Sequence, residues 1–166
     1  MKELKPISLD GEGFNILKDA VVALMNDFHG LDGREISFSG LTADGGISME
    51  PESGALIYTE RTDIVGNVHQ ECQFPFYVVY RTDAASEYAR KGIVEFLDML
   101  GAWVCREPII YQRALYQLTE YPKLTGGRKI TSVTRFNSYA LEPNANNTQD
   151  WLIPITVKYT HEFTLW

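Results

Sequence analysis

The sequence has few cysteines and no long hydrophobic run, and each absence removes a class of protein. Cys72 and Cys105 are the only two, and neither has C-x-x-C spacing, so a disulfide scaffold is excluded and both thiols are predicted to be buried. No run approaches the ~20 apolar residues that cross a bilayer, and no apolar segment follows Met1. We therefore expect no membrane partner and no export.

Basic residues are also scarce. Lysine and arginine number 15 against 22 acidic residues, which gives a formal net charge of −7. Tight binding to nucleic acid depends on clustered cations, so sequence-specific binding of DNA or RNA is not expected. An acidic surface remains compatible with DNA that passes by without being held.

Motifs that carry chemistry are missing as well. Gly11-Glu12-Gly13 lacks the third glycine and the preceding strand of a dinucleotide-binding motif, and is predicted to be a flexible lead-in. His69 and Glu71 would share one strand face while Cys72 faces the other, which leaves too few ligands for a metal. No serine sits in a G-x-S-x-G elbow. The sequence thus predicts no enzyme, no cofactor and no metal site.

Two segments show the spacing of amphipathic helices. Apolar residues recur every three or four positions from 14 to 28 and again within 84 to 104, where Pro108 follows. We predict one domain over 1–166, with an N-terminal lead-in at 1–12 and an irregular arm at 106–128.

The remaining segments alternate with the period of strands. Residues 150–163 place an apolar side chain at nearly every second position, with Trp151, Ile155 and Val157 predicted to face the core. A polar loop joins this strand to residues 129–141, so the two long C-terminal strands should be antiparallel. Pro75 predicts that its strand, 69–81, lies at an edge or pairs regularly only after the proline. The predicted fold is α+β, with two helices packed on one face of a mainly antiparallel, twisted β-sheet.

Two polar loops are the candidate contact sites, either for a partner protein or, if copies of the chain enclose a channel, for its lumen. The acidic candidates lie among glycine-containing turns, and the asparagine candidates lie in a polar hairpin linker. The candidates are Asp44, Glu50, Glu52, Asn144, Asn146 and Asn147.

Four short motifs, in this order of elements, resemble the minor capsid or tail terminator proteins of long-tailed phages and prophages over residues 14 to 166. They are Asp83-Ala84-Ala85, Tyr121-Pro122-Lys123-Leu124, Gly127-Arg128-Lys129-Ile130 and Asp150-Trp151-Leu152. The resemblance implies a homo-oligomeric ring, typically a hexamer, that caps the tail tube and joins it to the head connector. It brings no catalytic residue.

The resemblance also implies the partners and the location. They would be other copies of this chain, with a monomer expected at high dilution, the tail tube protein and the head-connector protein. The location would be the bacterial host cytoplasm during assembly and then the virion. Two alternatives stay open: another neck or tail-tube component of the same particle, and a small-molecule-binding domain or enzyme with its site between helix and sheet.

Overall fold

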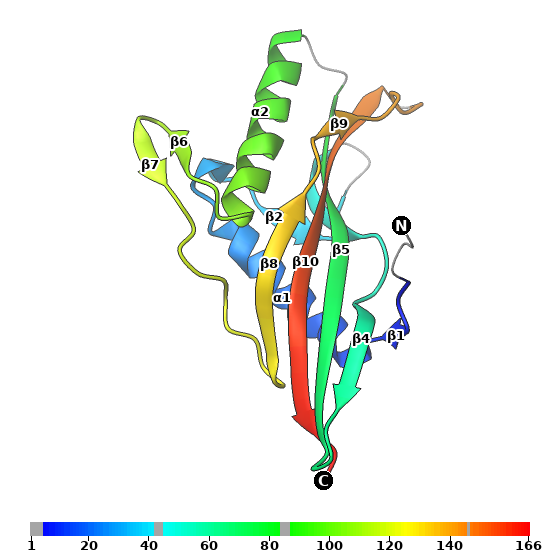
Figure 1. The fold of residues 1–166 in the computed structure, drawn as a ribbon. Helices are drawn as coiled ribbons and strands as arrows, with labels where there is room; N and C mark the ends of the chain where they lie inside the picture. Colours follow the sequence, from blue (N-terminus) through cyan, green and yellow to red (C-terminus); the bar gives the residue numbers. More distant parts are fainter. Residues whose placement is uncertain (1–4, 42–44, 84–86, 146) are drawn as a thin grey trace.

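The computed structural model describes residues 5–41, 45–83, 87–145 and 147–166. Two α-helices and one large sheet make up most of it (Figure 1). In chain order the elements are β1 (Ser8–Leu9), α1 (Gly11–Asn26), the 3-10 helix η1 (His29–Leu31), β2 (Ile36–Phe38), β3 (Gly46–Pro51), β4 (Leu56–Thr62), β5 (Asn67–Asp83), α2 (Glu87–Val104), β6 (Ile109–Tyr111), β7 (Ala114–Tyr116), β8 (Arg128–Arg135), β9 (Tyr139–Ala140) and β10 (Thr148–Thr164).

The antiparallel pair β5–β10 forms the centre of the sheet. Each strand has 17 residues, and the register runs without interruption from Thr148 opposite Asp83 to Thr164 opposite Asn67. β8 and the short β9 pair with the other side of β10, while β3 and β4 pair with the other side of β5. β2 runs parallel to β3, and the other described pairs are antiparallel.

Two prolines interrupt neither central strand, because each lies where the neighbouring strand changes. Pro75 falls between the β3 partner Phe76 and the β4 partner Gln73, and its carbonyl accepts from the Glu52 amide at 3.2 Å. Pro154 of β10 lies between β8 and β9, and its carbonyl accepts from the Phe136 amide at 3.1 Å. The nitrogen atoms of the two prolines, which have no N–H to donate, therefore face the breaks between neighbouring strands. Both alternatives predicted for the strand of Pro75 are wrong, since β5 is central and pairs with β10 before the proline as well as after it.

Both helices pack on the same face of the sheet, as the sequence predicts. In α1, Leu17, Val21 and Met25 are buried at four-residue spacing. Phe28 follows that helix and contacts Phe96 and Trp103 of α2, with ring centroids 6.0 Å and 5.5 Å apart. The core also takes the predicted side chains of β10, Trp151, Ile155 and Val157, all of which are buried. The α+β fold with long C-terminal strands is confirmed.

The predicted lead-in is ordered at its end, which corrects the boundary at residue 12. Ser8 and Leu9 pair with β4, and α1 begins at Gly11 because the Asp10 carboxylate accepts the Gly13 amide at 3.0 Å as an N-cap. The glycines of Gly11-Glu12-Gly13 therefore belong to the first helical turn.

The predicted arm at 106–128 contains more regular structure than its sequence suggests. β6 and β7 form a two-stranded hairpin, with Ile110 opposite Leu115. Only after Tyr116 does the chain become irregular, and it then runs beside β8 before joining it (Figure 1). Among the described residues, no helix is long and apolar enough to cross a membrane.

Candidate functional site

The predicted partner-contact residues do not form one site. Glu50 lies within β3, not in a loop, and its carboxylate accepts from the hydroxyls of Ser48 at 2.6 Å and Ser39 at 3.1 Å. Glu52 is exposed just after β3. Asp44 and Asn146 lie outside the described residues.

The two described asparagines serve the turn before β10. The Asn144 amide donates to the Thr148 carbonyl at 2.6 Å, and the Asn147 amide donates to the Asn144 carbonyl at 3.0 Å. Asn147 has a φ of 64°, a left-handed conformation that asparagine adopts more readily than most residues. Their hydrogen bonds shape the loop, and their role as partner contacts stays a prediction.

The residues weighed as metal ligands are engaged elsewhere. His69 Nδ1 lies 2.8 Å from a Glu162 carboxylate oxygen, and Glu71 accepts from the Thr59 hydroxyl at 3.1 Å. Cys72 is buried, and this burial raises the pKa of its thiol to about 11. Within the described parts of the chain, no group of three His, Cys, Asp or Glu side chains is placed to hold a metal ion.

A buried polar cluster connects the residue that precedes α1 to β8 and β10. Arg128 donates from Nε and Nη2 to the two oxygens of Asp10 at 3.0 Å and 2.7 Å, and the Tyr159 hydroxyl donates to Asp10 at 2.7 Å. The three side chains are almost fully buried. Buried charges persist only when paired and hydrogen-bonded, so this cluster fixes α1 and β1 to the start of β8 and the end of β10.

The cluster should make the protein sensitive to acid. Burial raises the pKa of Asp10, but hydrogen bonds from Arg128, Tyr159 and Gly13 outweigh it, so the pKa lies below 3.8. His161 is partly desolvated and lies near the Arg128 charge, which lowers its pKa below 6.5. Both groups bind fewer protons when folded than when unfolded, so stability falls as pH falls.

We therefore expect two losses of unfolding free energy on acidification. The first begins near pH 6.5 and comes from His161, and the second begins near pH 3.8 and comes from Asp10. Urea unfolding across a pH series measures both, and His161→Gln should remove the first alone. Stability that is flat between about pH 7.5 and 5 would contradict the assignment to His161.

A groove lies between β8 and the irregular part of the arm. It has a volume of about 680 Å³, which is within the range of pockets that hold small ligands or short peptide segments. Tyr121 holds the arm in place, since its hydroxyl donates to the Val104 carbonyl of α2 at 2.9 Å. The apolar lining comes from Tyr121, Pro122, Leu124 and Ile130. The charged lining comes from Arg106, Lys123, Lys129, Glu120 and Arg128, the last of which is paired with Asp10.

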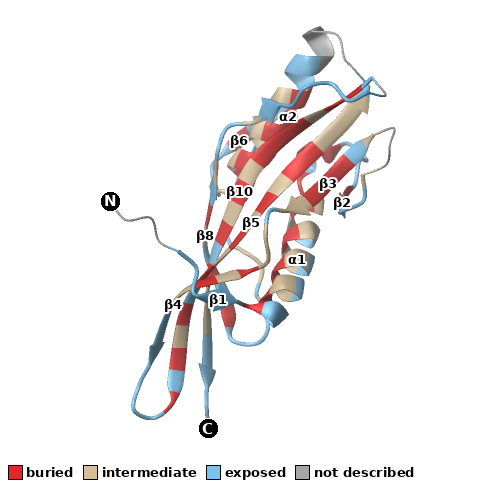
Figure 2. Ribbon diagram, turned by 90° about the vertical axis from the view of Figure 1, so that its right-hand side faces the viewer, coloured by how far each residue is buried: buried red, intermediate tan, exposed pale blue. Residues whose placement is uncertain are grey.

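At the end of the sheet away from α2, the strands β4, β5 and β10 project as a ribbon. β8 stops pairing at Arg128 opposite His161, whereas β10 continues beside β5 for three more residues, accompanied by the end of β4. Figure 2 shows that the ends of β4 and β10 are exposed in this lower part, while β5 still has buried residues there. The turn that joins β4 to β5, residues 63–66, forms the tip.

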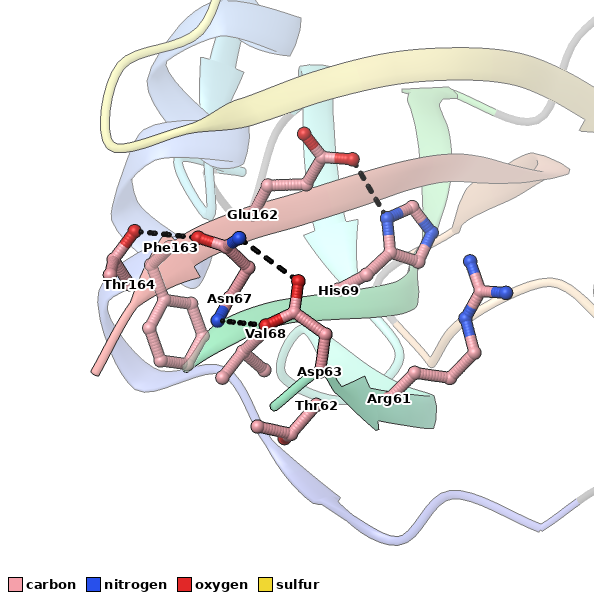
Figure 3. Close-up of a pocket in the computed structure, with 9 residues that line it drawn as sticks. All are labelled: Arg61, Thr62, Asp63, Asn67, Val68, His69, Glu162, Phe163 and Thr164. Atoms are coloured by element: carbon pink, nitrogen blue, oxygen red, sulfur yellow. Dashed lines mark hydrogen bonds and ion pairs between the residues drawn. The ribbon is translucent and has the colours of Figure 1, made fainter. Parts of the chain in front are cut away.

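Hydrogen bonds to one carboxylate make this tip rigid. Asp63 accepts from the backbone amide of Asn67 at 2.9 Å and from its side chain at 3.0 Å (Figure 3). It also accepts from the backbone amide of Val65 at 2.9 Å. These bonds lower the pKa of Asp63. The Leu165 amide donates to the Gly66 carbonyl at 2.8 Å, so the C-terminal residues lie against the turn.

Large apolar side chains are exposed at this tip. Ile64 is 99% exposed and Trp166 is 79% exposed, while Val65 and Leu165 are each more than half exposed. Beside them a hollow of about 690 Å³ is lined by polar residues that include Arg61, His69 and Glu162 (Figure 3). An apolar group held rigidly in water at a projecting end is typical of a contact surface.

In the described residues neither β8 nor the end of β4 pairs with a further strand, although the irregular arm runs beside β8. Among the described residues, β8 pairs only with β10, and residues 59–62 of β4 pair only with β5. A register shift within each of these strands partly guards the edge against random strand pairing. One chain therefore carries two different open sides.

A search of protein families finds no match to the chain, and a search of curated proteins finds none either.

Proposed function

We propose that this chain is a tail terminator of a long-tailed phage or prophage, a structural protein that forms a ring on the end of the tail tube. The observation that carries the proposal is that one rigid sheet has two dissimilar open sides, the β8 groove and the β4 ribbon. Contacts between two different surfaces repeat head to tail, and they close into a ring when the rotation per subunit divides a circle. The proposal that this ring is a tail terminator rests on the resemblance of the four sequence motifs to that family.

In this proposal the partners are other copies of the chain, the tail tube protein and the head-connector protein. Assembly takes place in the host cytoplasm, and the ring then stays in the virion. Six copies would carry a formal charge of −42, six times −7, which suits a lumen that DNA crosses without binding. Another neck or tail-tube component of the particle would use the same open sides and is the second candidate.

The proposal predicts self-association that depends on protein concentration. Sedimentation or light scattering should show the 18.8 kDa chain converting to a species near 113 kDa as concentration rises, or when tail tubes are added. A matched sample with tube protein should contain tubes that stop growing once capped. A chain that stays at 18.8 kDa in every condition and leaves tube length unchanged would contradict the proposal. That result would favour the alternative of a small-molecule-binding domain or enzyme.

A further inference from the structure

Resting on the proposed ring, we propose that the ribbon tip of one copy inserts into the β8 groove of the next. The ribbon tip is residues 63–66 with the C-terminal residues 165 and 166, and the β8 groove is the space between residues 128–131 and 120–124. The occupant of the groove is thus a second copy of this chain.

The apolar parts of the two surfaces match in character. Ile64 projects from a turn that Asp63 already holds in one conformation, so little conformational freedom is lost when it is bound. In the groove, the half-buried Pro122 and Leu124 offer apolar surface to receive it, above the buried Ile130. Burying a fully exposed isoleucine removes more apolar area from water than burying one already half covered, and this makes Ile64 the anchor.

The charges of the two surfaces are opposite. The end of the ribbon has a small acidic excess, because Asp63 and Glu162 outnumber Arg61 there. Glu60 and Glu71 lie further along the strands, level with Arg128 and Lys129. Around the groove, Arg106, Lys123 and Lys129 outnumber Glu120. The chain as a whole has a net charge of −7, so the excess of cations around the groove is opposite in sign to the charge of the rest of the chain. Complementary potentials of this kind select the partner and oppose the general repulsion between copies.

The tip cannot reach the groove of its own chain. β5 and β10 lie between β4 and β8, and adjacent strands are ~4.8 Å apart, so the two surfaces occupy opposite edges of one rigid sheet. The tip also points along the strands, away from α2 (Figure 1). Only another copy can bring tip and groove together, and such a contact is head to tail.

Two variants test the two sides separately. Ile64→Asp places a charge at the tip, and Lys123→Glu with Lys129→Glu reverses the groove, at residues that are all exposed. Each variant should raise the concentration needed for half-assembly at least about tenfold, as expected for loss of an interface anchor or a charge reversal. The unfolding temperature of each variant should stay near that of the unmodified protein. An unchanged temperature would show that the variant folds.

Matched controls separate this contact from general effects of charge and hydrophobicity. Ile110→Asp removes an equally apolar, 72% exposed side chain on β6, and Lys5→Glu with Lys91→Glu gives the same net charge of −11 as the groove variant. Both controls should assemble as the unmodified protein does. If they lose assembly to the same extent as the tip and groove variants, the contact is placed wrongly.

A photocrosslink identifies the occupant directly. A benzophenone amino acid at position 64, in a chain that also carries the reversed groove, is mixed with the Ile64→Asp chain and illuminated. The expected product is a covalent pair near 38 kDa, twice 18.8 kDa, with the link mapped by mass spectrometry to residues 120–131 of the Ile64→Asp chain. Absence of the pair, a link to another surface, or a link only to added tube protein would overturn the inference.

The outcomes also distinguish this contact from the proposed function. If the unmodified protein forms rings and both interface variants form them equally well, the ring stands and the tip-in-groove contact fails. If the unmodified protein never assembles, alone or with tail tubes, while the crosslink is found, the contact stands and the terminator function fails.

Discussion

Replacing Asp10 with alanine is expected to lower the free energy of unfolding by about 3 to 5 kcal/mol, the range found when one partner of a buried ion pair is removed. The substitution leaves the Arg128 guanidinium buried without its carboxylate, and the Tyr159 hydroxyl without its acceptor. It also removes the N-cap of α1, which by itself is worth about 0.5 to 2 kcal/mol. Urea unfolding at neutral pH measures the loss.

The control for Asp10 is an ion pair at the surface. Glu107 accepts from Arg135 Nε at 3.2 Å, but its side chain is about half exposed. Glu107→Ala should therefore cost no more than about 1 kcal/mol. Equal losses from the two substitutions would show that the cluster of Asp10, Arg128 and Tyr159 does not hold the fold together in the way described.

Truncating Ile155 to alanine is expected to cost about 2 to 5 kcal/mol. Ile155 is 1% exposed in the middle of β10, opposite Phe76, so the change removes buried apolar atoms and leaves a cavity under the helices. Thr156 is the matched control, because it is the next residue on the same strand, points to the face without helices and is only half buried.

Thr156→Ala should cost less than about 1 kcal/mol in the same urea experiment. If the two substitutions cost the same, or if Thr156→Ala costs more, the register of β10 is shifted by one residue, since a shift of one exchanges the faces of a strand.

Local pattern was enough to predict the elements that bury one face. The helical spacing of Leu17 and Val21 and the period-two spacing from Trp151 to Tyr159 each follow from burial on one side, and both are found. The predicted boundary of α1 is wrong because Asp10, which caps the helix, lies in the segment predicted to be a lead-in. The spacing from Asp10 to Gly13, with polar residues before an apolar stripe, is a local signal that could have located it.

Contacts between distant residues could not be predicted in this way. Asp10 meets Arg128 and Tyr159 across 118 and 149 positions of sequence, and no periodicity reports such a meeting. Pro75 illustrates the same limit, because whether a proline interrupts a central strand depends on where the neighbouring strands change.

The candidate contact surface shows the limit for function. Turn composition predicts Glu50 and Asn144 as contact residues, but the hydrogen bonds of both are local. The ribbon tip contains the turn residues Asp63 and Gly66, yet nothing in the sequence tells that the Ile64 between them stays in water. Exposure of a large apolar side chain is a property of the folded sheet.

Electron microscopy of the purified protein, with and without tail tubes, tests the central claim most directly. The proposal predicts closed rings of uniform size in concentrated samples, and a single such ring at the end of each tube of limited length. Only monomers in the free samples, together with uncapped tubes of unlimited length, would contradict it.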